Sequence, residues 1–241
     1  AIRVQHNFTI GYSRIEVNDS VIHPPYNPNY FGMNSSNIGF LDLSYTYSYQ
    51  FVDNSAYPLK GLSGYFNIAK RGIDFTGGVN YASIEGGINK YIRLKRNWYT
   101  SFQGLAKIKA PFDLAYINQK ALGYGDANLR GLERYVIDGP AYALARNTLK
   151  KKILSFNVNL PFNIKIKSVP FIPFTFFLKT YADAGFVHNI KKYSTSLNNK
   201  FLYTGGFGID LLSLYDSFIK IEYSFNQLGK NGVFLTGQIS F

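Results

Sequence analysis

The sequence lacks cysteine altogether and is poor in acidic residues. Its 241 residues include 14 Asp and Glu against 26 Lys and Arg, and charged residues make up only 17%, below the roughly 25% typical of soluble proteins. The absence of cysteine excludes a disulfide framework, a thiolate metal site and a cysteine nucleophile. The net charge of +12 predicts an acidic neighbour or an anionic surface beside the protein.

The sequence also has no run of about 18 apolar residues, so it predicts no transmembrane helix. The longest candidate, Val169–Leu178, is short and contains Pro170 and Pro173. Ala1 leads directly into an alternating pattern rather than into a signal peptide. We therefore expect the chain to be a mature form or a fragment.

What the sequence has instead is a long alternation of apolar and polar residues, together with 17% aromatic residues. Near the C-terminus, Val233, Leu235 and Ile239 fall on one face, and Thr236 and Gln238 fall on the other. A period of two is typical of β-strands. The pattern predicts ten strands, over residues 1–17, 38–52, 59–70, 81–95, 98–110, 142–160, 170–188, 200–212, 217–226 and 232–241.

The polar face of these strands indicates the class of fold. It carries charged residues such as Arg3, Asp42 and Lys107 besides Ser, Thr, Asn and Gln, whereas the opposite face is bulky and aromatic on nearly every strand. Transmembrane barrels present apolar residues to lipid and polar residues to the lumen. We therefore expect one domain over 1–241, an all-β, antiparallel transmembrane β-barrel of the bacterial outer membrane. A soluble sandwich is the alternative that alternation alone leaves open.

The predicted connections alternate between long and short, as in outer-membrane barrels with short periplasmic turns and long external loops. If the C-terminus lies at the periplasmic side, the external loops are 18–37, 71–80, 111–141, 189–199 and 227–231. Loop 111–141 is the longest, and loops of such length are usually functional.

Loop 111–141 carries a specific motif. Its tetrad Leu129-Arg130-Gly131-Leu132 fits the pattern (Val/Ile/Leu)-Arg-Gly-(Phe/Tyr/Leu). In this motif the chain resembles the BamA-type outer-membrane assembly and translocation superfamily, the bacterial surface antigen family. That superfamily also includes TamA, the two-partner secretion transporters and barrels fused to patatin-like phospholipases. The tetrad lies there in the long sixth external loop, which folds back into the lumen.

The resemblance covers 98–241, and extends to 1–97 only as a pattern of alternation. Downstream of the loop, Tyr181–Val187 resembles the second strand that follows this loop in the family. The aspartate of that strand points into the lumen, and here it is Asp183, followed by Gly185 in an Asp-x-Gly arrangement.

The last strands resemble the family as well. Gly205–Leu211 followed by Phe218–Tyr223 is similar to its penultimate hairpin. Gly237, Ile239 and Phe241 resemble the C-terminal signal that the assembly machinery reads. Deletion of Phe241 is therefore expected to impair assembly of the barrel.

The resemblance implies an anchor for the loop inside the lumen. Arg130 is expected to meet acidic groups on the inner wall, with Asp183 as its partner, because a buried guanidinium requires a paired carboxylate. Gly131 would let the backbone turn tightly beside it. The alternative is that Arg130 and Asp183 are ordinary surface charges.

The chain departs from the family in three respects. Where the family often has a second acidic partner four residues before a proline, this sequence has Asn157 before Pro161. As a lumen partner, Asn157 can hydrogen-bond the guanidinium of Arg130 but cannot neutralise it, so the anchor is expected to be weaker or to use another carboxylate, such as Asp210 or Glu222. The family barrel has sixteen strands, whereas ten are predicted here. The periplasmic POTRA modules that usually accompany the barrel are absent from this sequence. The chain is therefore expected to be either the C-terminal portion of a sixteen-stranded barrel or a short variant closed by ten strands.

The resemblance implies insertion of client barrels, or passage of a polypeptide across the outer membrane, without enzymatic activity, nucleotide or cofactor. The implied partners are outer-membrane lipids and lipopolysaccharide, client polypeptides and accessory outer-membrane or periplasmic proteins. Nucleic acid is not expected, because the cations are scattered rather than gathered in one stripe. The implied mechanism is a weak seam between the first and last strands, where an unpaired edge favours pairing with a client strand.

Two other functions stay open at this point. The chain is alternatively a passive membrane anchor or pore, for instance for a fused patatin-like domain, or a structural or adhesive barrel that presents its external loops. Lys150–Lys152 with Arg146 is expected at the external end of its strand, where it would bind lipopolysaccharide phosphates or simply balance charge at a solvated rim. The histidines, His6, His23 and His188, are too far apart in sequence to indicate a metal site or a catalytic group.

Overall fold

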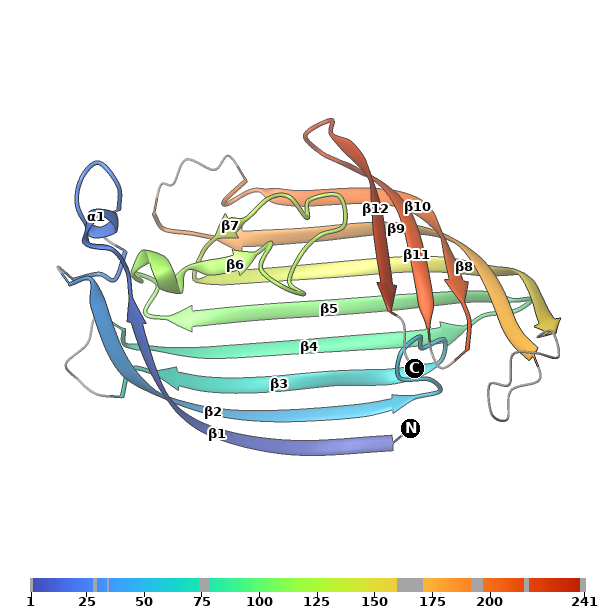
Figure 1. The fold of residues 1–241 in the computed structure, drawn as a ribbon, viewed down its shortest axis with the longest axis horizontal. Coiled ribbons are helices and arrows are strands. Elements are labelled where there is room, and N and C mark those ends of the chain that lie inside the picture. Colours follow the sequence, from blue (N-terminus) through green and yellow to red (C-terminus); the bar gives the residue numbers. More distant parts are fainter. Residues whose placement is uncertain are drawn as a thin grey trace.

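The alternating segments form one continuous antiparallel sheet (Figure 1). The computed structural model describes residues 2–27, 30–33, 35–73, 79–159, 171–191, 197–214 and 217–238. Within them, ten strands lie side by side in their order along the chain. They are β1 (Ile2–Glu16), β2 (Asn37–Val52), β3 (Gly61–Arg71), β4 (Tyr81–Arg93), β5 (Trp98–Ala110), β8 (Ala141–Asn159), β9 (Phe171–His188), β10 (Phe201–Leu212), β11 (Phe218–Asn226) and β12 (Asn231–Gln238).

The predicted all-β class and the ten predicted strands are confirmed. Their bounds differ from the predicted ones by at most two residues wherever both ends lie among the described residues. The sequence did not predict the short elements inside the long connections, because they are too short to carry a periodic pattern. These are the helix α1 (Asp19–Ile22), a 3₁₀ turn (Tyr116–Asn118) and a ribbon of β6 (Lys120–Leu122) paired with β7 (Ile137–Asp138).

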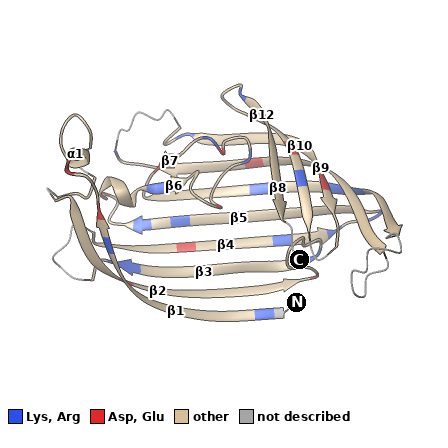
Figure 2. Ribbon diagram, in the orientation of Figure 1, with Lys and Arg blue, Asp and Glu red and all other residues tan. Residues whose placement is uncertain are grey.

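The sheet buries its polar face and exposes its apolar face, which is the reverse of the arrangement in a soluble protein. On β9, Lys179 and Asp183 are buried on the inner face, whereas Leu178 and Phe186 on the outer face are 49% and 40% exposed. Phe8 on the outer face of β1 is 80% exposed. Figure 2 shows the charged residues at single positions along the strands. A soluble antiparallel sheet buries its apolar face on a core, so this arrangement argues against the sandwich alternative.

The sheet is strongly curved, and β10, β11 and β12 turn steeply across the direction of the other strands (Figure 1). The connection between β5 and β8 lies on the concave side. Among the described residues, β1 and β12 are the two edges of the sheet and do not pair with each other. The fold is therefore a curved antiparallel sheet in which no closure into a barrel is seen over these residues.

No helix in the described part of the chain is both long enough and apolar enough to cross a membrane.

Connections fold onto the inner face from both ends of the sheet. The largest buried apolar cluster joins the loop between β5 and β8 to strands β8–β10, through Leu129, Leu144 and Leu202 among others. At the opposite end, Tyr57 in the turn between β2 and β3 packs against Phe177 of β9, with ring centroids 5.5 Å apart. The inner face is thus covered by chain at both ends.

The expected position of Lys150–Lys152 at the loop end of its strand is wrong. β8 begins at Ala141, directly after the loop, and at about 3.3 Å per residue Lys150 lies about 30 Å further along. Lys151 pairs with Trp98, which follows the turn at the other end of β5. The side chain of Lys150 is on the inner face, next to Asp210. This lysine run therefore does not form one exposed cluster for lipopolysaccharide.

Candidate functional site

The tetrad motif is brought to the inner face by the ribbon at the base of its loop. β6 pairs with β7, and the chain between them, 123–136, folds over the sheet. Leu129 and Leu132 are buried in the same apolar cluster as Leu202 of β10. Because these two leucines fix the backbone on both sides of Arg130, its side chain is directed at the sheet.

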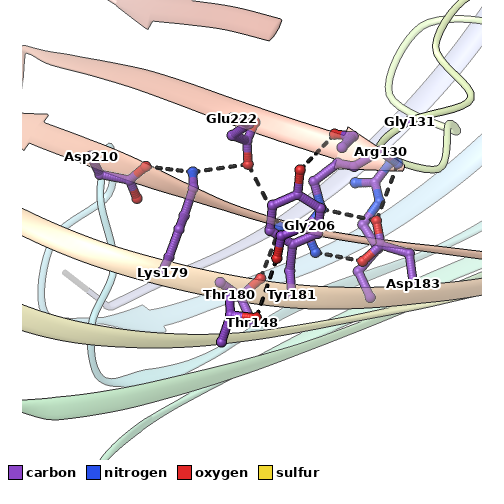
Figure 3. Close-up of polar contacts among 12 residues, drawn as sticks. Arg130, Gly131, Thr148, Lys179, Thr180, Tyr181, Asp183, Gly206, Asp210 and Glu222 are labelled. Carbon is purple, nitrogen blue, oxygen red and sulfur yellow. Dashed lines mark hydrogen bonds and ion pairs between the residues drawn. The ribbon is translucent and has the colours of Figure 1, made fainter. Parts of the chain in front are cut away.

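Arg130 makes a bidentate ion pair with Asp183 (Figure 3). Its Nε donates to Oδ2 at 2.9 Å, its Nη2 donates to Oδ1 at 2.5 Å, and its own backbone N–H also donates to Oδ2 at 3.1 Å. Nη1 donates to the hydroxyl of Thr148 at 3.0 Å, and the guanidinium carbon lies 3.9 Å from the centroid of the Tyr181 ring. The Asp183 side chain is fully buried. The contact expected from the sequence is therefore present, and it is not a pair of ordinary surface charges.

A second carboxylate contacts Arg130, and it comes from β11. Glu222 Oε1 lies 3.8 Å from Nη1 of Arg130 and 2.9 Å from Nζ of Lys179. Lys179 also pairs with the buried Asp210 (Figure 3). Of the two carboxylates that the sequence offered as substitutes, Glu222 contacts the guanidinium directly, and Asp210 acts through Lys179.

The expectation that Asn157 is a partner inside the anchor is wrong. Asn157 is exposed and pairs with Pro173 near the far end of β8. On β8, Arg130 instead contacts the hydroxyl of Thr148 and the backbone carbonyl of Asn147, about 30 Å back along the strand at 3.3 Å per residue. The alignment to a family position failed because the depth of a residue depends on the pairing register and not on its spacing from a proline.

Two glycines make room for the tetrad. Gly131 has a φ of +90°, which L residues rarely adopt, and a Cβ there would lie 3.1 Å from Cβ of Ser224. Its N–H donates to Oε2 of Glu133 at 2.6 Å, and burial raises the pKa of that carboxyl above its usual range. At Gly185 on β9, a Cβ would lie 3.0 Å from Cδ1 of Leu129. The tight turn expected at Gly131 is present, and Gly185 leaves space for the loop.

Replacement of Gly131 by alanine is expected to destabilise the protein more than the same change at Gly125. Both glycines have positive φ, which costs an L residue about 1–2 kcal/mol. A Cβ at Gly125 meets nothing within 4 Å, whereas the crowding at Gly131 should add about 1–3 kcal/mol. Urea unfolding of the two variants in detergent micelles measures the difference, and equal losses would contradict a close contact between the tetrad and β11.

Sequence reasoning missed the role of Arg146, which it treated as a rim residue. Its guanidinium donates to the Gln103 side chain at 2.8 Å, and to backbone carbonyls of Asp126 and Asn128 in the loop, with 2.8 Å to the former. Arg146 is also the register partner of Asp183. Because residues two apart in a strand lie on the same face, Arg146 faces the same way as Thr148. This spacing is the signal from which its inward position could have been predicted.

The remaining predicted residues are at the C-terminus. Gly237 lies in β12, where it pairs with Ile219 of β11. Ile239 and Phe241 lie outside the described residues, so the proposed terminal signal stays a prediction.

Fold and site together define an all-β protein in which a long loop is fixed by buried ion pairs to the inner face of a curved sheet. Among the described residues no group of three or more His, Asp or Glu side chains is arranged to hold a metal ion. No protein-family model matches the chain, and no curated protein sequence is significantly similar to it.

Proposed function

We propose that this chain forms the wall of an outer-membrane β-barrel of the BamA-like kind and acts in the insertion or translocation of polypeptides. The observation that carries the proposal is the seating of Arg130, within its Leu-Arg-Gly-Leu tetrad, on Asp183 of the inner wall. The geometry supports a lumen-anchored loop, which is the feature that the resemblance associates with this function.

Membrane insertion is supported by the outer face and by the strand lengths. A strand of about 9–11 residues crosses a bilayer at a tilt, and β1 and β9 contain 15 and 18 residues. Their outer faces carry exposed apolar side chains such as Ile10, Leu178 and Phe186. In water such a face would be an aggregation hazard, whereas in lipid it is the expected surface of a barrel.

The position of the loop within the strand order supports the same family. The sixth external loop of a sixteen-stranded barrel is followed by five strands. Among the described residues, five strands, β8 to β12, follow loop 111–141. Unpaired edges are costly in lipid, so the proposed barrel closes either through pairing of β1 with β12 or through further strands.

The loop would act on the wall next to the edge strand β12. Arg130 contacts Thr148 on β8, Asp183 on β9 and Glu222 on β11. The carbonyl of Gly131 also accepts from the side chain of Asn226 on β11 at 2.7 Å. The tip of this loop therefore contacts three strands close to the edge at which a client strand would pair.

The test is insertion of a reporter barrel into liposomes that contain the purified protein. Wild-type protein is expected to raise insertion above that of empty liposomes, and Arg130→Ala is expected to reduce it towards that level. The matched control is Arg134→Ala, at an exposed arginine of the same loop, which is expected to leave insertion unchanged. Ion conductance without reporter insertion would contradict the proposal and favour a passive pore, and the absence of both would favour a structural or adhesive barrel.

A further inference from the structure

A cavity of about 380 Å³ lies on the inner face, between the turn that joins β2 to β3 and strands β8, β9 and β11. Its volume falls within the range of small-molecule pockets, about 300–1,000 Å³. The loop anchor accounts for only part of its wall. Five cationic side chains line it: Arg130, Arg146, Lys150, Lys179 and Lys220.

The carboxylates that contact these cations do not balance them. Three take part in the ion pairs: Asp183, Asp210 and Glu222. Among the residues that the structure describes, five cations thus face three carboxylates, which is an excess of two positive charges. Charge of one sign focused in a partly buried hollow raises the local concentration of counter-ions, so the cavity favours an anion.

Of the five cationic groups, the ammonium of Lys220 has the fewest polar contacts with described residues of the protein. In the part of the chain that the structure describes, its ammonium group takes part in no ion pair with a carboxylate and in no hydrogen bond. It lies 4.4 Å from the centroid of the Phe218 ring and 5.8 Å from that of Tyr57. The ammonium of Lys150 lies 4.0 Å from the same Tyr57 ring. Two ammonium groups therefore flank one aromatic ring, and the three donors of Lys220 are available to a ligand.

We propose that this cavity binds a phosphate group, as inorganic phosphate or as the phosphate monoester of a small molecule. Lys220 is its principal contact, and Lys150 is the second. A phosphate monoester carries about −1.5 to −2 charges at pH 7, which matches the excess of two positive charges, whereas a monovalent anion would neutralise only half of it. Tyr91, Ser101 and Thr236 also line the cavity, and each carries a hydroxyl group of the kind that donates to phosphate oxygens.

The phosphate site does not rest on the proposed function in polypeptide insertion. The cavity lies on the inner face of the sheet in either case, and its wall includes the turn between β2 and β3 and Lys220 of β11, whose ion pairs and hydrogen bonds with described residues include none to the loop. Loss of phosphate binding and loss of reporter insertion are therefore separate results.

The test is calorimetric titration of the full chain in detergent with inorganic phosphate and with glycerol 3-phosphate, at constant ionic strength set by chloride. Saturable binding of at least one probe is expected, and the tighter of the two identifies the source of the phosphate group. Lys220→Gln is expected to weaken the binding about tenfold or more, because it removes a charge-assisted contact. Lys220→Arg keeps the charge and is expected to retain binding.

Lys230→Gln is the matched control, because Lys230 is an exposed lysine in the turn between β11 and β12. It is expected to bind phosphate like the wild type. Circular dichroism checks that Lys220→Gln keeps its sheet. The proposal is overturned if neither probe binds the wild-type protein, or if Lys220→Gln binds as tightly as Lys230→Gln.

Discussion

Replacement of Arg130 by alanine is expected to lower the free energy of unfolding by about 3–5 kcal/mol, the range seen when one partner of a buried ion pair is removed. Among the described residues, the fully buried Asp183 carboxylate would keep only its contact with the backbone N–H of the loop. Urea unfolding of the protein in detergent micelles, followed by the fluorescence of its single tryptophan, measures the change.

The control for this variant is Arg134→Ala, which removes an exposed arginine from the same loop and is expected to change stability by no more than about 0.5 kcal/mol. Asp183→Ala is expected to cost about as much as Arg130→Ala, and the double variant is expected to cost less than the sum. Each variant should also make residues 111–141 more sensitive to proteases. Additive losses together with unchanged protease sensitivity would contradict the anchor.

Replacement of Asp210 by alanine is expected to be the second large effect, again about 3–5 kcal/mol. The Asp210 side chain is fully buried, pairs with Lys179, and lies 3.5 Å from Nζ of Lys150. Its Oδ2 also accepts the hydroxyl of Tyr57 at 2.6 Å. Removing the carboxylate therefore leaves two ammonium groups on the inner face without this counter-charge.

Two further variants are comparisons for Asp210→Ala. One removes only the hydrogen bond from Tyr57 to Asp210, and the other breaks an exposed ion pair elsewhere in the protein. Burial raises the pKa of the Tyr57 hydroxyl well above its usual range, so this group remains a donor, and Tyr57→Phe is expected to cost about 1.5–3 kcal/mol. Asp113→Ala breaks the ion pair with Lys191 at 2.9 Å, but the Asp113 side chain is 76% exposed, so a loss of at most about 1 kcal/mol is expected. If Asp210→Ala were no more destabilising than Asp113→Ala, the buried network would have no structural role.

The buried network links the two segments that cover the inner face. It runs from Arg130 through Glu222, Lys179 and Asp210 to Tyr57 in the turn between β2 and β3. A polypeptide that moved along the inside of the proposed barrel would have to displace both the loop and this turn. Pairing of a client strand at the edge β12 requires neither displacement, so we favour this route for the proposed function.

The sequence by itself determined the class of fold and one contact of the site. A period of two needs only the alternating geometry of an extended chain, so the ten strands, the apolar outer face and the inward side of Asp183 followed from residue order. Likewise, a buried guanidinium has few chemically acceptable partners, which is why Arg130 and Asp183 were paired before their distance was known.

Only the tertiary structure decided which other side chains complete the site. Glu222 replaces the expected Asn157, Arg146 holds the loop, and Lys150 lies on the inner face rather than at an exposed rim. Each of these positions depends on the register between strands and on the curvature that brings β11 towards β8. Register and curvature arise from pairing between distant segments. The alternation of apolar and polar residues along a single strand carries no information about that pairing.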